Sequence, residues 1–306
     1  MAKIVGALMT SHVPAIGGAI ARGVQHEAYW KPFFDGFDAV HAWLDRVRPD
    51  TVVIFYNDHG LNFFLDKMPT FAVGAAPEYH NADEGWGLPV LRPFPGDLDL
   101  SWHVIEQLVQ ADFDITTCQE MLVDHAFVVP MSLLWPGADA RPVRTVPIAI
   151  NTVQHPMPSA ARCFALGQAV GRAIESFPRD ARVLILGTGG LSHQLDGQRA
   201  GFINKEFDLM CMDKLVDDPA ALTGYSNPEL IEHAGTQGVE LVMWIAARGA
   251  LLHGARKLHS NYHIPISNTA AGLLLLENPA FGAPEQYPLS VPLAATGSPP
   301  RQRPRA

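Results

Sequence analysis

The sequence RVLILGTGGLSH, residues 182–193, indicates the fold more directly than any other stretch of the chain. Val, Leu and Ile follow one another, and a glycine-rich turn and a histidine come directly after them. Because no polar residue alternates with the apolar ones, the run is typical of a strand covered on both faces. It predicts an interior strand of an α/β sheet.

Three further stretches have the same form: KIVGALMTSH (3–12), TVVIFYNDHG (51–60) and VRTVPIAINT (143–152). Helical spacing of apolar residues lies between them, and we expect helices over 30–47, from the N-cap Ser101 onward, and at about 159–176, 204–216, 238–249 and 267–277. The segment 77–100, rich in Pro, Gly and Asp, predicts a long loop that is functional or covered by a partner. We therefore expect a single α/β domain with a central mixed or parallel sheet flanked by helices, over residues 1–288, followed by a flexible C-terminal tail over 289–306.

Composition excludes several classes of function. The net charge is −9, and the dense basic run is confined to the Pro-rich end PPRQRPRA, so no nucleic-acid partner is expected. The N-terminus predicts a strand and no signal peptide, and no apolar run is long enough for a membrane span. Three scattered cysteines do not predict a disulfide framework. We expect a cytoplasmic protein that binds no membrane.

Three histidines occupy equivalent places in the pattern. His12, His59 and His193 each come just after a predicted strand. Ligands of open α/β sheets bind beyond the carboxyl ends of strands, so these side chains can converge on one site. The alternative is that each is a capping or turn histidine.

Glu240 is the candidate carboxylate. It lies in GVELVMWIAARGAL, a helix that is apolar around most of its circumference. An ionised carboxylate there costs several kcal/mol unless it is paired or binds a cation. The alternative is an exposed Glu near a helix N-terminus, where the dipole favours negative charge.

Two histidines and one carboxylate form the donor set of non-haem Fe(II) oxygenases, with positions left for substrate and O₂. Zinc hydrolases use the same residue types, so the residues alone do not select the metal.

Eight motifs make a family resemblance visible. They are TSHVPAIG (10–17), YNDHG (56–60), PTFAVG (69–74), ADEGWG (82–87), VDHAFVVPMS (123–132), GTGGLSHQLDGQRAGFINKEFD (187–208), GVELVMWIAARGAL (238–251) and YHIPISNTAAG (262–272). In this order they resemble the catalytic β subunits of protocatechuate 4,5-dioxygenases, members of the class III extradiol dioxygenases. The resemblance covers roughly residues 1–278.

The resemblance implies a role for each matching residue. His12, His59 and Glu240 match the Fe(II) ligands, His193 matches an acid/base, and His125 matches a histidine near the substrate oxygens. Ser267 and Asn268 match the region that receives the substrate carboxylate, and we expect the predicted helix that they open to favour that anion. Asn57 is expected among the substrate-binding residues. Ala126 and Phe127 depart from the family pattern and predict a bulkier pocket wall.

The implied reaction is O₂-dependent 4,5-cleavage of protocatechuate to 4-carboxy-2-hydroxymuconate semialdehyde. Gallate or 3-O-methylgallate is the alternative substrate within the family, and a zinc-dependent hydrolase on the same ligands is the more remote alternative. The resemblance also implies a small α subunit, a homodimer or both. The chain is expected to lack the fused, α-like C-terminal domain of gallate dioxygenases.

Overall fold

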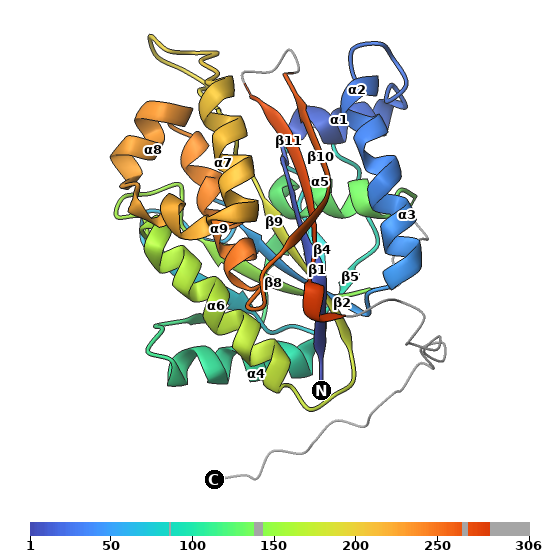
Figure 1. Ribbon diagram of the computed structural model, residues 1–306, viewed down its shortest axis with the longest axis vertical. Coiled ribbons are helices and arrows are strands. Elements are labelled where there is room, and N and C mark those ends of the chain that lie inside the picture. The colour runs from blue at the N-terminus through green and yellow to red at the C-terminus, as the bar shows by residue number, and fades with distance from the viewer. Residues whose placement is uncertain (86, 138–142, 265–268, 282–306) are drawn as a thin grey trace.

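A mixed eight-stranded sheet forms the centre of the molecule in the computed structural model, which describes residues 1–85, 87–137, 143–264 and 269–281 (Figure 1). The strand order is β10-β11-β1-β9-β2-β8-β3-β6. The strands are β1 (Lys3–Thr10), β2 (Thr51–Tyr56), β3 (Phe71–Gly74), β6 (Thr116–Cys118), β8 (Arg144–Ile150), β9 (Arg182–Thr188), β10 (Arg256–His263) and β11 (Ala271–Glu277). The four central strands β1, β9, β2 and β8 run parallel, whereas β11 and β3 lie antiparallel at their sides. The predicted α/β class, the mixed sheet and all four predicted strands are confirmed.

Helices cover both faces of the sheet, as Figure 1 shows. One face carries α4 (Leu98–Gln110), α6 (Ala160–Ser176), α7 (Lys205–Asp217), α8 (Asn227–Ala234) and α9 (Leu241–Gly249). The other carries α1 (Pro14–Arg22), α2 (Lys31–Phe34), α3 (Asp38–Val47) and α5 (His125–Leu134). Short 3₁₀ helices are η1 (Asp35–Phe37), η2 (Pro219–Gly224), η3 (Gly238–Glu240) and η4 (Pro279–Phe281). Alternate residues of β9 enter the two cores, Val183 on one side and Leu184 on the other, which explains the unbroken apolar run.

The helix predicted over residues 267–277 is wrong. Residues 271–277 form β11, which lies between β10 and β1 and is buried along its whole length. Its consecutive leucines pack into both cores, and burial on two faces favours a strand here over the helix that leucine favours in isolation.

Ser101 is not an N-cap. The helix begins at Leu98, one turn earlier, and the carboxylate of Asp97 accepts the hydrogen bond from the backbone N–H of Leu100. Ser101 is buried inside the helix. Both residues are good caps by type, and the earlier one forms the cap.

The segment predicted as a long loop is only partly irregular. β4 (Glu78–Asn81) pairs with β5 (Phe94–Pro95) and with β7 (Leu122–Val123) in a small second sheet, while the described residues of 82–93 belong to no helix or strand. The predicted tail, 289–306, lies outside the described residues, as do Ser267 and Asn268. Within the described ranges, no helix combines the length and the apolar character needed to cross a bilayer.

The parallel centre of the sheet brings distant segments together. Thr10 at the end of β1 pairs with Thr188 at the end of β9, and Phe55 near the end of β2 pairs with Gly187. The residues that follow these strands therefore leave the sheet at the same edge.

Candidate metal centre

His12, His59 and Glu240 meet at this edge of the sheet. His12 follows β1, His59 follows β2, and Glu240 ends η3, directly before α9. Nε2 of His12 lies 3.4 Å from Oε2 of Glu240, and Nε2 of His59 lies 3.5 Å from Oε1. The two imidazole rings meet edge to face, with centroids 5.3 Å apart. The structure thus brings together three side chains that are far apart in the sequence.

The carboxylate of Glu240 is buried, with 5% of the residue exposed, so the alternative of an exposed helix-terminal Glu is wrong. Its Oε2 accepts a hydrogen bond from the backbone N–H of Gly190 at 3.2 Å. Gly189 has a φ of +91°, and a Cβ at this position would lie 2.9 Å from Oε2 of Glu240. The glycine turn of GTGG therefore leaves the space that the carboxylate occupies.

Both histidines have their other ring nitrogen already bonded. Nδ1 of His12 lies 3.1 Å from the hydroxyl of Thr188. Nδ1 of His59 lies 2.9 Å from Oδ2 of Asp124, an acceptor, so the proton of this ring belongs on Nδ1. Such partners fix the ring and leave Nε2 as the donor atom, which is how metal-binding histidines are oriented. The three side chains therefore fit a divalent cation in both donor type and orientation.

The charges at the centre point to the same conclusion. Burial lowers the pKa of His12 to about 3, although Glu240 opposes the shift. Burial also lowers the pKa of His59, but the hydrogen bond and charge of Asp124, together with Glu240, raise it to a net value of about 10. Burial raises the pKa of Glu240, yet the neighbouring histidines hold it well below its usual range. The histidines therefore favour the ionised form of the buried carboxylate, which is the form that binds a metal cation.

Asn57, predicted to bind substrate, contacts the proposed ligands themselves. Its Nδ2 lies 3.0 Å from Nε2 of His59 and donates to Oε1 of Glu240 at 3.2 Å. Its Oδ1 is buried and has no hydrogen-bond partner. A role in orienting the carboxylate follows from these contacts, whereas contact with substrate stays a prediction.

His125, expected to lie near the substrate oxygens, is in direct contact with the proposed ligand His59. It is the first residue of α5, and its ring stacks on His59 with centroids 4.2 Å apart and an interplanar angle of 27°. One ligand-capable nitrogen from each of His12, His59 and His125 lies within 4.8 Å of the other two.

His193 approaches the centre from the β9 side and is only partly buried. Its backbone N–H donates to the carbonyl of Ala234 at 2.6 Å, and its backbone pairs with that of Thr269. Burial lowers the pKa of its imidazole. The charge of Glu240 raises this pKa, whereas those of His59 and His125 lower it further. This shift favours the neutral imidazole, which is the form that can accept a proton.

The prediction that Phe127 forms a bulkier wall of the substrate pocket is wrong. This side chain is fully buried, with its ring 5.0 Å from that of Phe94 and 5.9 Å from that of Tyr56, measured between centroids. Phe127 belongs to the hydrophobic core beneath the α5 side of the sheet.

Three residues that support the centre escaped the sequence reasoning: Thr188, Asp124 and Glu84. Asp124 is a regular N-cap, since Oδ1 accepts the backbone N–H of Ala126 at 3.0 Å, and this ordinary role hides its second contact with His59. Glu84 binds His125 from the irregular segment after β4. The signal available in the sequence was the presence of both carboxylates inside the motifs VDHA and ADEGWG.

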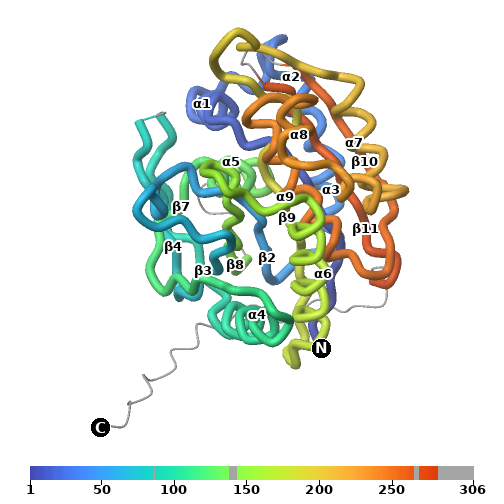
Figure 2. Tube along the Cα trace, turned by 90° about the vertical axis from the view of Figure 1, so that its left-hand side faces the viewer, coloured from blue at the N-terminus to red at the C-terminus, as the bar shows by residue number. Residues whose placement is uncertain are grey.

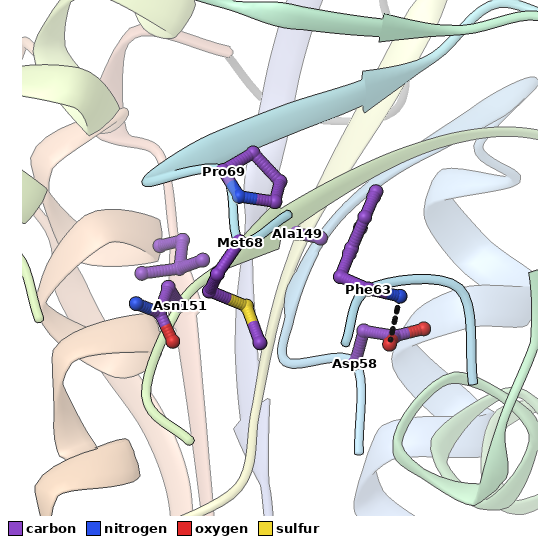
Figure 3. A pocket seen from close by; sticks show the side chains of 7 residues that line it. Asp58, Phe63, Met68, Pro69, Ala149 and Asn151 are labelled. Atoms are coloured by element: carbon purple, nitrogen blue, oxygen red, sulfur yellow. Dashed lines mark hydrogen bonds between the residues drawn. The ribbon is translucent and has the colours of Figure 1, made fainter. Parts of the chain in front are cut away.

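The loop that carries His59 is held by its neighbour Asp58, whose carboxylate accepts backbone N–H groups of Leu61, Asn62 and Phe63 at 2.9–3.2 Å. Behind this loop a small hollow separates Asp58 and Phe63 from Met68, Pro69 and Asn151, as Figure 3 shows. The loop conformation is thus set locally, and His59 is presented from a fixed backbone.

Comparison with known proteins assigns the family. Residues 6–272 match the family described as the catalytic LigB subunit of aromatic ring-opening dioxygenase. A gallate dioxygenase of Pseudomonas putida KT2440 is 42% identical over 197 residues, a match that covers 64% of this chain and 58% of that enzyme. A 2,3-dihydroxyphenylpropionate/2,3-dihydroxicinnamic acid 1,2-dioxygenase of a Rhodococcus species is 30% identical over 290 residues, covering 77% of this chain and 89% of the relative.

A solved structure, that of the uncharacterized protein JW3007 of Escherichia coli K12, shares the fold with a TM-score of 0.53 and 14% identity, covering 89% of this chain and 99% of that one. The family match spans the segments that supply His12, His59, His193 and Glu240. Dioxygenases of this family use non-haem Fe(II). The chain belongs to the family of catalytic LigB subunits of aromatic ring-opening dioxygenases and is an extradiol dioxygenase of class III.

Proposed function

We propose that this chain opens the ring of a catecholic acid beside its diol, with O₂ as co-substrate and Fe(II) held by His12, His59 and Glu240. The observation that carries the proposal is the convergence of two histidine Nε2 atoms on the two oxygens of one buried carboxylate, at 3.4 and 3.5 Å. This is the donor set of the non-haem iron oxygenases that bind substrate and O₂ at open positions.

Bound by these three side chains, Fe(II) would supply one cation at which the catechol oxygens and O₂ can be brought together. The contribution of the chain is to fix the ligands before substrate arrives. Thr188 and Asp124 orient the two imidazoles, and the N–H of Gly190 orients the carboxylate. Side chains held in this way lose little conformational freedom when metal binds.

His193 is the proposed acid/base. As a neutral imidazole it can accept the proton of a substrate hydroxyl and return a proton later in the reaction. His125 is proposed to contact a substrate oxygen, since it lies against His59 on the side of α5.

Gallate is the proposed substrate, because a gallate dioxygenase is the relative with 42% identity. Protocatechuate, favoured by the motif resemblance, is the second candidate. The Rhodococcus relative also acts, by its name, on catechols that carry an acid group. Ser267 and Asn268 stay predicted to bind that group on the resemblance alone, because the described residues 271–277 form β11 and not the helix expected to favour an anion.

The proposed partners are a small α subunit, a second copy of the chain, or both, and the proposed compartment is the cytoplasm. The three cysteines, Cys118, Cys163 and Cys211, are free thiols, as is usual in a reducing compartment.

Expression of the chain alone and beside a candidate α subunit tests the proposed partner. Co-purification in a fixed ratio with a large gain in activity supports it, and full activity of a homodimer, unchanged by the added subunit, contradicts it.

The test of the function is O₂ uptake by anaerobically purified, Fe(II)-loaded protein. Gallate, 3-O-methylgallate, protocatechuate and unsubstituted catechol are compared, and ring opening is followed by product absorbance. Uptake with the carboxylated catechols, one O₂ per ring opened, is the expected result. Metal analysis that finds zinc, with no O₂ consumption by the iron-loaded protein, favours a hydrolase and contradicts the proposal.

The His193→Ala variant separates binding from chemistry. It is expected to keep its iron, because His193 is not among the proposed ligands, and to lose about 10²–10⁴-fold in kcat, the usual contribution of a positioned acid/base. Loss of iron from this variant would mean that His193 is a ligand.

A further inference from the structure

His125 is held by a carboxylate in the same way as His59. Asp124 accepts hydrogen bonds from both the backbone N–H and Nδ1 of His59, each at 2.9 Å. Glu84 accepts from the backbone N–H of His125 at 2.6 Å through one oxygen and from Nδ1 at 2.8 Å through the other. Two stacked imidazoles thus each have a carboxylate clamp.

The clamp fixes the orientation and the tautomer of His125. Attachment to both the backbone and the ring of one residue restricts rotation of the side chain. Because a carboxylate only accepts, the proton of the neutral ring belongs on Nδ1, and Nε2 carries the lone pair. The ring of His125 lies against those of His12 and His59, with centroids 5.5 and 4.2 Å away, and Nε2 is the ring nitrogen that Glu84 leaves free.

Capping of α5 does not require Glu84. Asp124 already caps this helix through the backbone N–H of Ala126. The side chain of Glu84 is 14% exposed, and it reaches the ring from outside the helix. Its contact with Nδ1 therefore serves the side chain of His125 and not only the helix terminus.

Glu84 comes from the segment between β4 and β5, which rises beside α1 and α5 in Figure 2. The segment is anchored at Asn81, whose Oδ1 accepts the backbone N–H of Leu91 at 2.8 Å. Leu88 packs so closely on α1 that a Cβ at Gly17 would overlap its side chain. The carboxylate that orients His125 thus rests on an anchored segment outside the main sheet.

We propose that Glu84 is a positioning residue that presents Nε2 of His125 as a hydrogen-bond acceptor for a substrate hydroxyl. The inference rests on the proposed function, because it takes the substrate to be a catechol bound beside His125. In this proposal the motif ADEGWG has a part in the reaction. Through Glu84 it determines whether Nε2 of His125 accepts or donates the hydrogen bond with the substrate hydroxyl.

The test compares Glu84→Gln with Glu84→Asp. Gln can accept the backbone N–H, but it turns an NH₂ group toward Nδ1, so the ring proton should move to Nε2 and the acceptor should become a donor. We expect kcat for gallate to fall about 10–100-fold, the usual effect of losing the partner that orients a histidine, with iron content unchanged. Asp keeps an acceptor, one methylene short, and should recover part of that loss. Glu78→Gln is the matched control, because it removes an equal charge from β4 at an exposed side chain.

A second readout does not depend on turnover. Nitrogen-15 NMR of the histidine rings in metal-free, full-length protein, with His125 assigned through His125→Asn, should show protonated Nδ1 in the wild type and protonated Nε2 in Glu84→Gln. Protonated Nε2 in the wild type, or unchanged kcat in Glu84→Gln, would overturn the inference. If the wild type opens no ring, the proposed function fails, and the NMR comparison still decides whether the clamp exists.

Discussion

Glu240 is the residue on which the proposed centre depends most, because it is the buried anion among the three ligands. Glu240→Ala should leave the fold intact and abolish stable iron binding, since two neutral imidazoles hold a divalent cation weakly without a carboxylate. Metal analysis after gel filtration, with circular dichroism for the fold, measures this. Glu232→Ala, which removes an exposed glutamate from α8, is the control. Full iron occupancy in Glu240→Ala would contradict the ligand assignment.

Asp124 acts on the centre through His59. Asp124→Asn can still cap α5, but an amide cannot both cap the helix and accept from Nδ1 of His59 as the carboxylate does. We expect metal affinity to fall about 10–100-fold, the usual effect of removing such a partner. Competition with a chromophoric chelator measures the affinity, and an unchanged affinity would mean that the hydrogen bond does not orient the ligand.

At the level of elements, the packing of α6 against α9 depends on small residues. A Cβ at Gly167 of α6 would overlap the carbonyl oxygen of Ala246 in α9 and lie 3.1 Å from Cα of Gly249. Gly167→Ala gains up to about 1 kcal/mol of helix propensity. The backbone overlap should cost more and leave a net loss of about 1–3 kcal/mol in the free energy of unfolding.

Urea denaturation of Gly167→Ala and Gly224→Ala tests this packing. Gly224 ends η2 with open space where a Cβ would be, so its replacement should change stability little. Equal stability of the two variants would show that α6 can move away from α9 at little cost.

The elements that could be predicted from the sequence are those whose residues are compatible with only one environment in a folded protein. Runs such as residues 182–188 indicate a buried strand because apolar residues on both faces have no other stable place. The leucines of β11 led to the wrong prediction of a helix. A short apolar run fits either a helix or a strand until its neighbours, here β10 and β1, are known. Position after a strand identified His12 and His59. Asp124 and Glu84 could not be identified in this way, because their partners come from other segments and only the folded chain pairs them.

For the molecule as a whole, metal binding and folding should be coupled, because the proposed ligands belong to three segments that meet only in the folded state. Metal at 100 times its dissociation constant should add about 2.7 kcal/mol to the free energy of unfolding. Anaerobic thermal unfolding with Fe(II) and with a chelator measures the difference in Tm. Glu240→Ala should show no such difference, and an equal metal-dependent rise in both proteins would place the stabilising metal elsewhere.

The strand order has a consequence for biosynthesis. β1 is the first strand to be synthesised, yet its neighbours in the sheet are β9 and β11, which come much later in the chain. Glu240, the carboxylate of the proposed centre, also lies late in the sequence. Both histidine ligands are therefore synthesised well before their anionic partner, and β1 cannot form its native pairs until β9 has been made. Pairings of such wide sequence separation form slowly. The proposed ligand set is therefore incomplete until Glu240 has been synthesised, and a metal ion can be held by all three side chains only after that point.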